Sequence, residues 1–298
     1  GLTDIVVVDH LGSSEKWKNL VGKRYEEYLE KDALFPHLEK GHLKEIDAVV
    51  HLGACSSTTE QNASYIMENN YIYSKRLAEW ALKNKKRFLY ASSGATYGAG
   101  EMGYSDSDET TLTLKPLNVY GYSKHAFDLW VIKNKLQNKF VGFKFFNVFG
   151  PNEGHKDDMR SMVNKGYSQI KKTGKLMLFK SHKEGFADGE QKRDFIYVKD
   201  AIEIVLYFLM HPEKSGIFNI GTGNAQTWND LAAALFMAMD VEPKVEYINM
   251  PEILRGKYQY FTEADLTKLY NINCEHKFFT LNDAVKDYVD YLKDESYL

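Results

Sequence analysis

Residues Asp4–Asp9, DIVVVD, form a short apolar run that ends in an acidic residue. Similar runs follow at Ile46–Gly53 (IDAVVHLG), Arg87–Ser93 (RFLYASS) and Val141–Val148 (VGFKFFNV), and amphipathic segments separate them. Apolar runs with few alternating polar residues, connected through helices, are typical of parallel strands that are buried on both faces. The sequence therefore predicts an α/β fold with a doubly wound, Rossmann-like parallel sheet.

Asp9 fits the end of the second strand of a dinucleotide-binding sheet, where a carboxylate binds a ribose. The first strand and a glycine-rich turn should then lie upstream, yet the sequence begins at Gly1 and contains no such turn there. The GTGNA stretch, Gly221–Ala225, comes too late, and we interpret it as a turn between a strand and a helix. Either the protein is truncated or this sequence omits its beginning. We favour the second explanation, because a sheet without its central strand leaves neighbouring strands unpaired.

The second half of the chain has more loops, a glycine-rich and charged stretch at residues 180–193, and a helical pattern at Asn229–Met239. We expect residues 1–150, with segments from about 190–222, to form the dinucleotide-binding domain. Residues 151–298 are expected to form mainly a smaller C-terminal substrate-binding lobe.

Composition narrows the class of protein. The net charge is −3, and a nucleic-acid binder needs a clustered positive field, so nucleic acid is not an expected partner. Cys55 and Cys274 are the only cysteines, too few and too far apart for a disulfide framework or a metal site. No apolar run reaches the roughly 18 residues of a membrane span, and no leader pattern opens the sequence. We expect a reduced, cytoplasmic protein without a membrane partner.

The stretch NVYGYSK, Asn118–Lys124, contains the clearest chemical signal. Tyr120 and Lys124 are spaced i, i+4 before an apolar segment of helical period, so both should share one helix face, with Tyr122 pointing elsewhere. A cation beside a phenol lowers the pKa of the tyrosine, which suits a general acid/base acting on a secondary alcohol. By spacing alone, an exposed helix pair is the commoner explanation.

A predicted strand that ends in ASSGATYG brings Ser92 and Ser93 to the carboxyl edge of the sheet, where ligands bind in such folds. A serine there can hydrogen-bond the same substrate oxygen that the tyrosine protonates or deprotonates. This context favours a catalytic role for the tyrosine and lysine pair.

Five segments in this order, ASSGATYG, PLNVYGYSK, FKFFNVFGP, RDFIYVKD and IFNIGTG, resemble the extended short-chain dehydrogenase/reductases that act on nucleotide sugars, over nearly the whole chain. Four others are similar to the ADP-heptose 6-epimerase family: GACSSTTE (Gly53–Glu60), NNYIYSK (Asn69–Lys75), GPNEGHK (Gly150–Lys156) and RGKYQYFTEADL (Arg255–Leu266). The resemblance implies an isomerase that converts ADP-D-glycero- to ADP-L-glycero-D-manno-heptose for lipopolysaccharide core synthesis. It also implies a homo-oligomer, often a pentamer.

Carbon 6 of a heptose has no neighbouring carbonyl, so simple deprotonation cannot invert it. The remaining route to inversion is hydride transfer from carbon 6 to a nicotinamide and back. Two acid/base groups are expected, because the hydroxyl lies on opposite sides in the two epimers. Tyr120 is the first, and the resemblance implies Lys156 as the second, a role that suits a buried lysine with a lowered pKa; a phosphate-pairing or surface lysine is the alternative. The resemblance adds Lys124 and Ser93 to the catalytic set.

The cofactor-binding residues that the resemblance implies are Asp9, His10, Lys16, Lys31, Leu52, Gly53, Ala54, Cys55, Ser56, Asn69, Lys124, Val148 and Lys156. Two lysines near the ribose favour NADP, whose 2′-phosphate needs compensating charge, whereas Asp9 is typical of NAD sites. We predict NADP, with NAD as the alternative. His10 stands where this family usually has asparagine.

The substrate-binding residues implied in the same way are Ser93, Asn147, Asp158, Lys165, Phe179, Lys180, Ser181, His182, Arg193 and Tyr258. The Arg193 guanidinium can bind a diphosphate with two parallel hydrogen bonds, and a salt bridge with Asp194 or another acid is its alternative role. Asn152 stands where the family pattern GPREGHK has arginine, so the sugar specificity could differ.

Other functions stay open. A UDP-hexose 4-epimerase is one alternative, although GPNEGHK argues against it. A non-catalytic remnant that binds a sugar nucleotide is another, if Gly1 is the true start. The ASSGATYG segment lacks the adjacent Asp-Glu pair that nucleotide-sugar 4,6-dehydratases use, which argues against a dehydratase.

Overall fold

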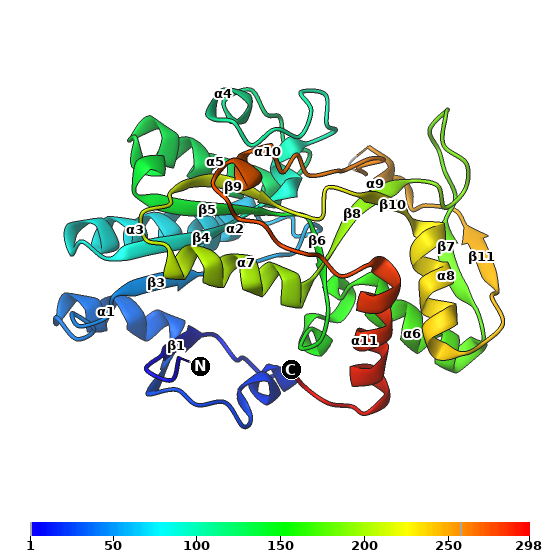
Figure 1. The fold of residues 1–298 in the computed structure, drawn as a ribbon, viewed down its shortest axis with the longest axis horizontal. Helices are drawn as coiled ribbons and strands as arrows, with labels where there is room; N and C mark the ends of the chain where they lie inside the picture. The colour runs from blue at the N-terminus through cyan, green and yellow to red at the C-terminus, as the bar shows by residue number, and fades with distance from the viewer. Residues whose placement is uncertain (1, 257) are drawn as a thin grey trace.

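A computed structural model of the chain describes residues 2–256 and 258–298. Its central sheet has four parallel strands in the order β3 (Ala48–His51), β4 (Arg87–Ser93), β5 (Phe140–Phe145) and β9 (Gly216–Ile220) (Figure 1). All four strands run in the same direction, so their carboxyl ends meet at one edge of the sheet.

Helices cover both faces of this sheet. On one face, α3 (Tyr73–Lys83) and α5 (Val119–Lys133) pack against the alternate β4 side chains Phe88 and Tyr90. On the other face, α7 (Val198–Met210) packs with a core that includes Leu89, Val141, Phe143 and Phe218. The period of two along a strand sends neighbouring side chains to opposite faces. The predicted doubly wound α/β arrangement is confirmed for these elements.

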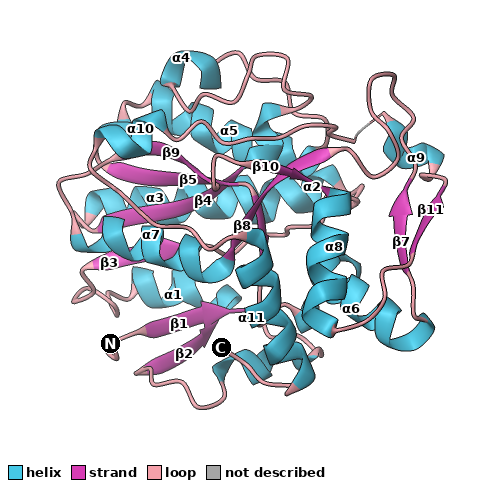
Figure 2. Ribbon diagram, turned by 45° about the vertical axis from the view of Figure 1, so that its right-hand side comes forward, coloured by secondary structure: helices cyan, strands magenta, loops and turns pink. Residues whose placement is uncertain are grey.

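β1 (Val6–Asp9) and β2 (Glu27–Glu30) form a separate parallel pair, followed by α1 (Leu34–Glu39). The pair lies beside the β3 edge of the central sheet (Figure 2), and within residues 2–256 and 258–298 it pairs with no further strand. The upstream strand and glycine-rich loop stay a prediction.

The run VGFKFFNV, expected to be one strand, is divided between two sheets. β5 ends at Phe145, the Phe146 N–H donates to the Ile220 carbonyl at 2.9 Å, and β6 (Asn147–Phe149) pairs with β8 (Lys192–Tyr197). β8 also pairs in antiparallel fashion with the short strand β10 (Ala225–Thr227). The expectation of a single strand is therefore wrong, because the chain leaves the central sheet after Phe145.

The C-terminal half forms its own core. α6 (Met162–Thr173), α8 (Trp228–Met239) and α11 (Leu281–Lys293) pack together around Val163, Leu235 and Val285, all with no exposed surface. β7 (Leu176–Phe179) and β11 (Val245–Ile248) form a parallel pair beside them. α8 contains the predicted helix Asn229–Met239, and β10 begins at Ala225, the last residue of GTGNA, before that helix begins. The division into two domains stays a prediction.

The remaining elements are short: η1 (Glu15–Leu20), η2 (Lys31–Ala33), α2 (Ala63–Ile66), η3 (Met67–Ile72), η4 (Gly94–Tyr97), α4 (Asp108–Thr111), η5 (Leu136–Asn138), η6 (Gly154–Met159), α9 (Glu252–Arg255) and α10 (Thr267–Asn271). Among the described residues, no helix combines the length and apolar character needed to cross a membrane.

Candidate active site

Tyr120 and Lys124 lie in the first turns of α5. The helix begins after Asn118, whose side-chain oxygen accepts a hydrogen bond from the Gly121 N–H at 2.8 Å, so an orphan donor of the first turn is satisfied. Lys124 is buried and Tyr120 is half-buried, whereas Tyr122 is 53% exposed. The i, i+4 spacing thus brings Tyr120 and Lys124 to the protein side of the helix and leaves Tyr122 in solvent.

The two serines at the end of β4 have different partners. Ser92 donates to the Asp128 carboxylate at 2.7 Å. Ser93 accepts from the Ala95 N–H at 3.1 Å, and it is close enough to the Tyr120 hydroxyl to lower the pKa of that tyrosine. Neighbouring strand residues point in opposite directions, so Ser93 is the serine that faces the tyrosine.

The expected effect of Lys124 on Tyr120 is wrong. Burial raises the pKa of Tyr120, and the hydrogen bond with Ser93 opposes this only in part. The Lys124 ammonium donates to the Ala91 carbonyl at 2.8 Å, and burial lowers the pKa of Lys124 to about 8 while the Asp128 charge opposes that change. Desolvation therefore sets the direction of the pKa shift of this tyrosine.

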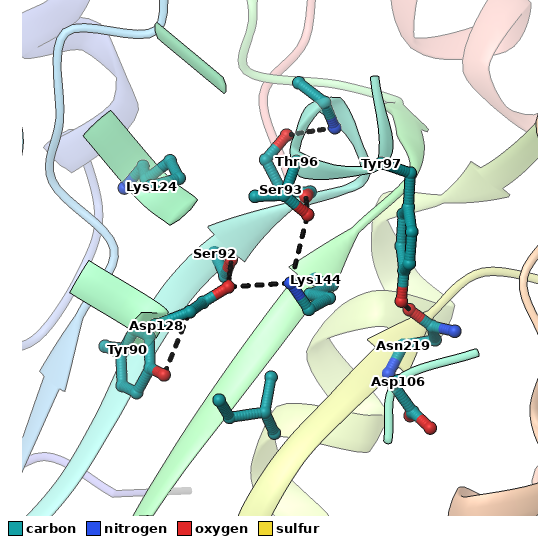
Figure 3. Close-up of polar contacts among 12 residues, drawn as sticks. Tyr90, Ser92, Ser93, Thr96, Tyr97, Asp106, Lys124, Asp128, Lys144 and Asn219 are labelled. Carbon is teal, nitrogen blue, oxygen red and sulfur yellow. Dashed lines mark hydrogen bonds and ion pairs between the residues drawn. The ribbon is translucent and has the colours of Figure 1, made fainter. Parts of the chain in front are cut away.

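A buried polar network lies beside these groups (Figure 3). The Lys144 ammonium, on β5, lies 2.7 Å from the Asp128 carboxylate, on α5, and both side chains have no exposed surface. Asp128 also accepts from the Tyr90 hydroxyl at 3.0 Å. The sequence interpretation missed this pair, although a charged residue inside the apolar run FKF and an aspartate four residues after Lys124 were both visible.

The residues predicted to bind the adenosine ribose gather at the ends of β1 and β2. Lys16 pairs with Asp9 at 2.5 Å, and the His10 ring pairs with Glu30. Lys31 donates to the Asn69 side chain at 2.7 Å. Two ammonium groups and the Asp9 carboxylate therefore lie at the same edge of this strand pair.

The loop Leu52–Ser56 follows β3 at the carboxyl edge. Asn70, which is 1% exposed, holds this loop, because its side chain accepts from the Cys55 N–H at 2.8 Å and donates to the Cys55 carbonyl at 2.9 Å. The same amide donates to the Ser123 hydroxyl on α5 at 3.0 Å. Asn70 thereby joins the predicted cofactor loop to the catalytic helix, a role that the sequence interpretation missed.

A cavity of about 310 Å³ lies between the end of β6 and the C-terminal elements. Six of the predicted cofactor- and substrate-binding residues line it: Asn147, Val148, Lys156, Lys165, Phe179 and Tyr258. They come from β6, η6, α6, β7 and the segment after α9, so the fold brings together residues that are more than 100 positions apart.

Arg193 lies next to this cavity and is 5% exposed. Its guanidinium stacks 4.8 Å from the Tyr258 ring and 5.8 Å from the Trp228 ring, and it donates to the Lys192 carbonyl at 2.8 Å. Asp194 instead accepts hydrogen bonds from Thr222 at 2.7 Å. In the described part of the chain Arg193 has no carboxylate partner, so the alternative of a salt bridge with Asp194 is wrong.

Among the described residues, six predicted substrate residues do not line the cavity: Ser93, Asp158, Lys180, Ser181, His182 and Arg193. Ser181 and His182 belong to the loop after β7, where their N–H groups donate to Asp188 at 2.8 Å and to the Tyr260 hydroxyl at 3.2 Å. The Asp158 carbonyl accepts from Lys165 at 3.2 Å.

Lys156 lines the cavity from η6, and its side chain is exposed. The burial that the predicted acid/base role invoked is therefore absent from this structure. The segment is anchored by Glu153, which is 6% exposed and accepts from the Ser161 N–H at 2.8 Å and the Tyr288 hydroxyl at 2.9 Å. Asp157, directly after Lys156, has φ 45° and ψ −121°, a strained conformation for a residue with a side chain.

The doubly wound sheet is that of a short-chain dehydrogenase/reductase, and the tyrosine, lysine and serine predicted to be catalytic lie together on α5 and at the end of β4. Residues 1–221 match the model of the NAD dependent epimerase/dehydratase family, and the chain belongs to this family.

Within the family, the chain is similar to ADP-L-glycero-D-manno-heptose-6-epimerases. It is 53% identical to that of Nitratidesulfovibrio vulgaris (strain DP4) over 290 residues, which cover 97% of this chain and 90% of the relative. The Fusobacterium nucleatum protein of the same name is 48% identical over 310 residues, 100% of this chain and 93% of the relative. The crystal structure of the Helicobacter pylori protein of that name superposes with a TM-score of 0.80, at 28% identity, over 97% of this chain and 88% of that one.

Proposed function

We propose that this protein is an ADP-heptose 6-epimerase, which converts ADP-D-glycero-D-manno-heptose to the L-glycero epimer. The full-length similarity to proteins of that name supports the proposal. The structural observation that carries it is the cavity where Asn147, Lys156, Lys165 and Tyr258 meet beside Arg193.

We propose NADP as the cofactor, with NAD as the alternative. Lys16 and Lys31 supply two cations at the ribose end, and the ion pair between Lys16 and Asp9 offsets the charge that a 2′-phosphate would otherwise meet. Asn70 holds the backbone of the Cys55 loop in a fixed position for the dinucleotide. When bound there, the nicotinamide would supply reversible hydride chemistry for carbon 6 of the sugar.

In this mechanism Tyr120 exchanges a proton with the 6-hydroxyl, and Ser93 hydrogen-bonds the same oxygen. The raised pKa of Tyr120 means that the phenol form prevails near neutral pH. Tyr120 is therefore best suited to donating a proton to the 6-oxygen when the hydride returns to carbon 6. Lys156, which lines the cavity from another element, is the proposed group for the opposite orientation.

Arg193 is the proposed diphosphate ligand. It is buried with its charge unopposed by a carboxylate in the described residues, and stacking on Tyr258 holds the guanidinium plane. Burying a cation without a counter-charge is costly, and a diphosphate group would supply that charge.

We further propose that residues 1–150, with residues from about 190–222, bind the cofactor, and that residues 151–298 bind mainly the sugar. A homo-oligomer, with a pentamer as the family implies, is proposed on resemblance alone.

The test is conversion of ADP-D-glycero-D-manno-heptose in deuterated water, with UDP-glucose assayed beside it. We expect the L-glycero epimer without deuterium at carbon 6, and no conversion of UDP-glucose to UDP-galactose. Deuterium at carbon 6 would exclude direct hydride return, and a preference for UDP-glucose would favour the 4-epimerase alternative. Mass spectrometry of nucleotide extracted from the purified protein decides between NADP and NAD.

A further inference from the structure

The ion pair of Asp128 and Lys144 is connected to both elements that carry candidate catalytic residues, α5 and the end of β4. Asp128 is one helical turn after Lys124 and two turns after Tyr120 on α5, and its carboxylate accepts from Lys144 at 2.7 Å. It also accepts from Ser92 at 2.7 Å, directly before the serine that faces the tyrosine. One carboxylate thus joins the tyrosine-bearing helix to two neighbouring strands.

Lys144 is connected to the end of β4, which carries Ser93. Its ammonium donates to the Thr96 hydroxyl at 3.0 Å, and that hydroxyl donates to the Ser93 carbonyl at 2.8 Å (Figure 3). Tyr97 presents its ring to the same ammonium at 5.2 Å. A continuous chain of hydrogen bonds therefore runs from Ser93 through Thr96 and Lys144 to Asp128.

Stability alone gives a weak reason for this arrangement. Moving two charges from water into an interior with no exposed surface carries a large desolvation cost, and apolar pairs of similar volume are often as stable or more so. What an apolar pair could not supply is directional bonding between α5 and the end of β4.

We propose that Asp128 and Lys144 are positioning residues that fix the placement of Tyr120 and Lys124 relative to Ser93. The inference rests on the proposed function for the reaction that these three groups perform. Neither member of the ion pair touches the substrate, since both are fully buried.

The pKa of Lys124 provides a second way to test the role of Asp128 and Lys144. Asp128 is the charge that raises the pKa of Lys124 against burial. His51, on β3, faces the same ammonium but is neutral, because burial lowers its pKa to about 3. Tyr90, on β4, is also neutral, since burial raises its pKa. Lys144, on β5, is the counter-charge of Asp128. Removing the Asp128 charge should therefore lower the pKa of Lys124 below about 8.

The experiment compares Asp128→Asn, Lys144→Met and the double variant. Each single variant leaves a buried charge unpaired, so its Tm falls, whereas the double variant removes both charges and regains much of the Tm. We expect kcat of the double variant to stay about 10- to 100-fold below wild type, because misplaced groups act more slowly. We also expect the alkaline limb of its pH profile to move to lower pH, with KM little changed.

Lys199→Met is the matched control. It removes a lysine that pairs with Asp287 at 2.7 Å, away from the catalytic groups. Its Tm should fall while kcat and the alkaline limb stay as in wild type. Thr96→Val, which is nearly isosteric, removes both hydrogen bonds of the Thr96 hydroxyl, the one from Lys144 and the one to the Ser93 carbonyl, and leaves the Asp128 and Lys144 pair in place. It should lower kcat about tenfold without moving the alkaline limb. This variant keeps the test open should the double variant not fold.

Wild-type kcat in Thr96→Val, or a folded double variant with wild-type kcat and pH profile, would overturn the inference. A readout independent of turnover is the ¹³C shift of the Lys124 side chain followed against pH, assigned by its loss in Lys124→Met. Its midpoint should fall by about one unit in the double variant, and an unchanged midpoint counts against the electrostatic part. If the wild-type protein does not convert ADP-heptose, the proposed function fails, while this titration still tests the pair.

Discussion

Gly121→Ala should separate helix stability from catalytic geometry. Gly121 follows Tyr120 on α5, where the helix lies directly against η4. A Cβ atom on Gly121 would lie 2.7 Å from the Ala95 carbonyl oxygen and 3.2 Å from Pro116 Cβ. The first contact is with backbone, so it cannot be relieved by a change of rotamer.

Two effects oppose each other in this variant. Alanine is favoured over glycine in a helix by at most about 1 kcal/mol. Overpacking against backbone costs about 1–3 kcal/mol. Restoring a contact distance of about 3.5 Å requires α5 to retreat by about 0.8 Å. We therefore expect the free energy of unfolding to fall by about 0–3 kcal/mol.

The retreat would carry Tyr120 away from Ser93. Because a misplacement of about 1 Å can cost about 100-fold in rate, kcat should fall between about 10- and 100-fold. Thermal denaturation and initial rates with ADP-D-glycero-D-manno-heptose measure the two effects. Gly256→Ala is the control, since its Cβ meets no described heavy atom within 4 Å. A Gly121→Ala protein with raised Tm and a kcat within twofold of wild type would refute the reasoning.

Three further predictions concern single side chains. Tyr120→Phe and Lys156→Met should each lower kcat by about 100- to 10,000-fold. Tyr122→Phe, at an exposed position, is the control, and its kcat should stay within twofold of wild type. Near-normal rates in both Tyr120→Phe and Lys156→Met would contradict the two-base proposal. Arg193→Lys should raise KM for the ADP-sugar about 10-fold or more, because the planar fork and its stacking are lost; isothermal titration with ADP checks the same loss, and unchanged ADP affinity contradicts the diphosphate role. Burial lowers the pKa of His51 from 6.5 to about 3, so the contribution of neutral His51 to the free energy of unfolding is fully present above pH 6.5 and is lost as the pH falls towards 3. His51→Gln should therefore reduce the dependence of the free energy of unfolding on pH in this range, as measured by chemical denaturation. An unchanged dependence would show that other groups cause it.

The sequence predicted the parts of the fold that depend on local pattern. The apolar runs at β1, β3 and β4 lie in strands, and α5 and α8 occur where helical period was visible. The exit from the central sheet at Phe146 was not predictable, because FKFFNV is apolar on both sides of the break.

The candidate site divides in the same way. Spacing selected Tyr120 over Tyr122, and the structure agrees on which of them faces the protein. The direction of the pKa shift of Tyr120 was wrong, because it depends on how deeply tertiary packing buries the phenol. The pair of Asp128 and Lys144 also depends on tertiary structure, since the two come from different elements that only the fold brings together.

The backbone at Asp157 matters for protein engineering. Glycine adopts φ 45° without the clash of a Cβ, so Asp157→Gly is a simple candidate in a search for heat-resistant variants, at an expected gain of about 1 kcal/mol. The same change would make the backbone next to Lys156 more flexible, so a gain in thermal stability at this position is expected to come with a lower kcat.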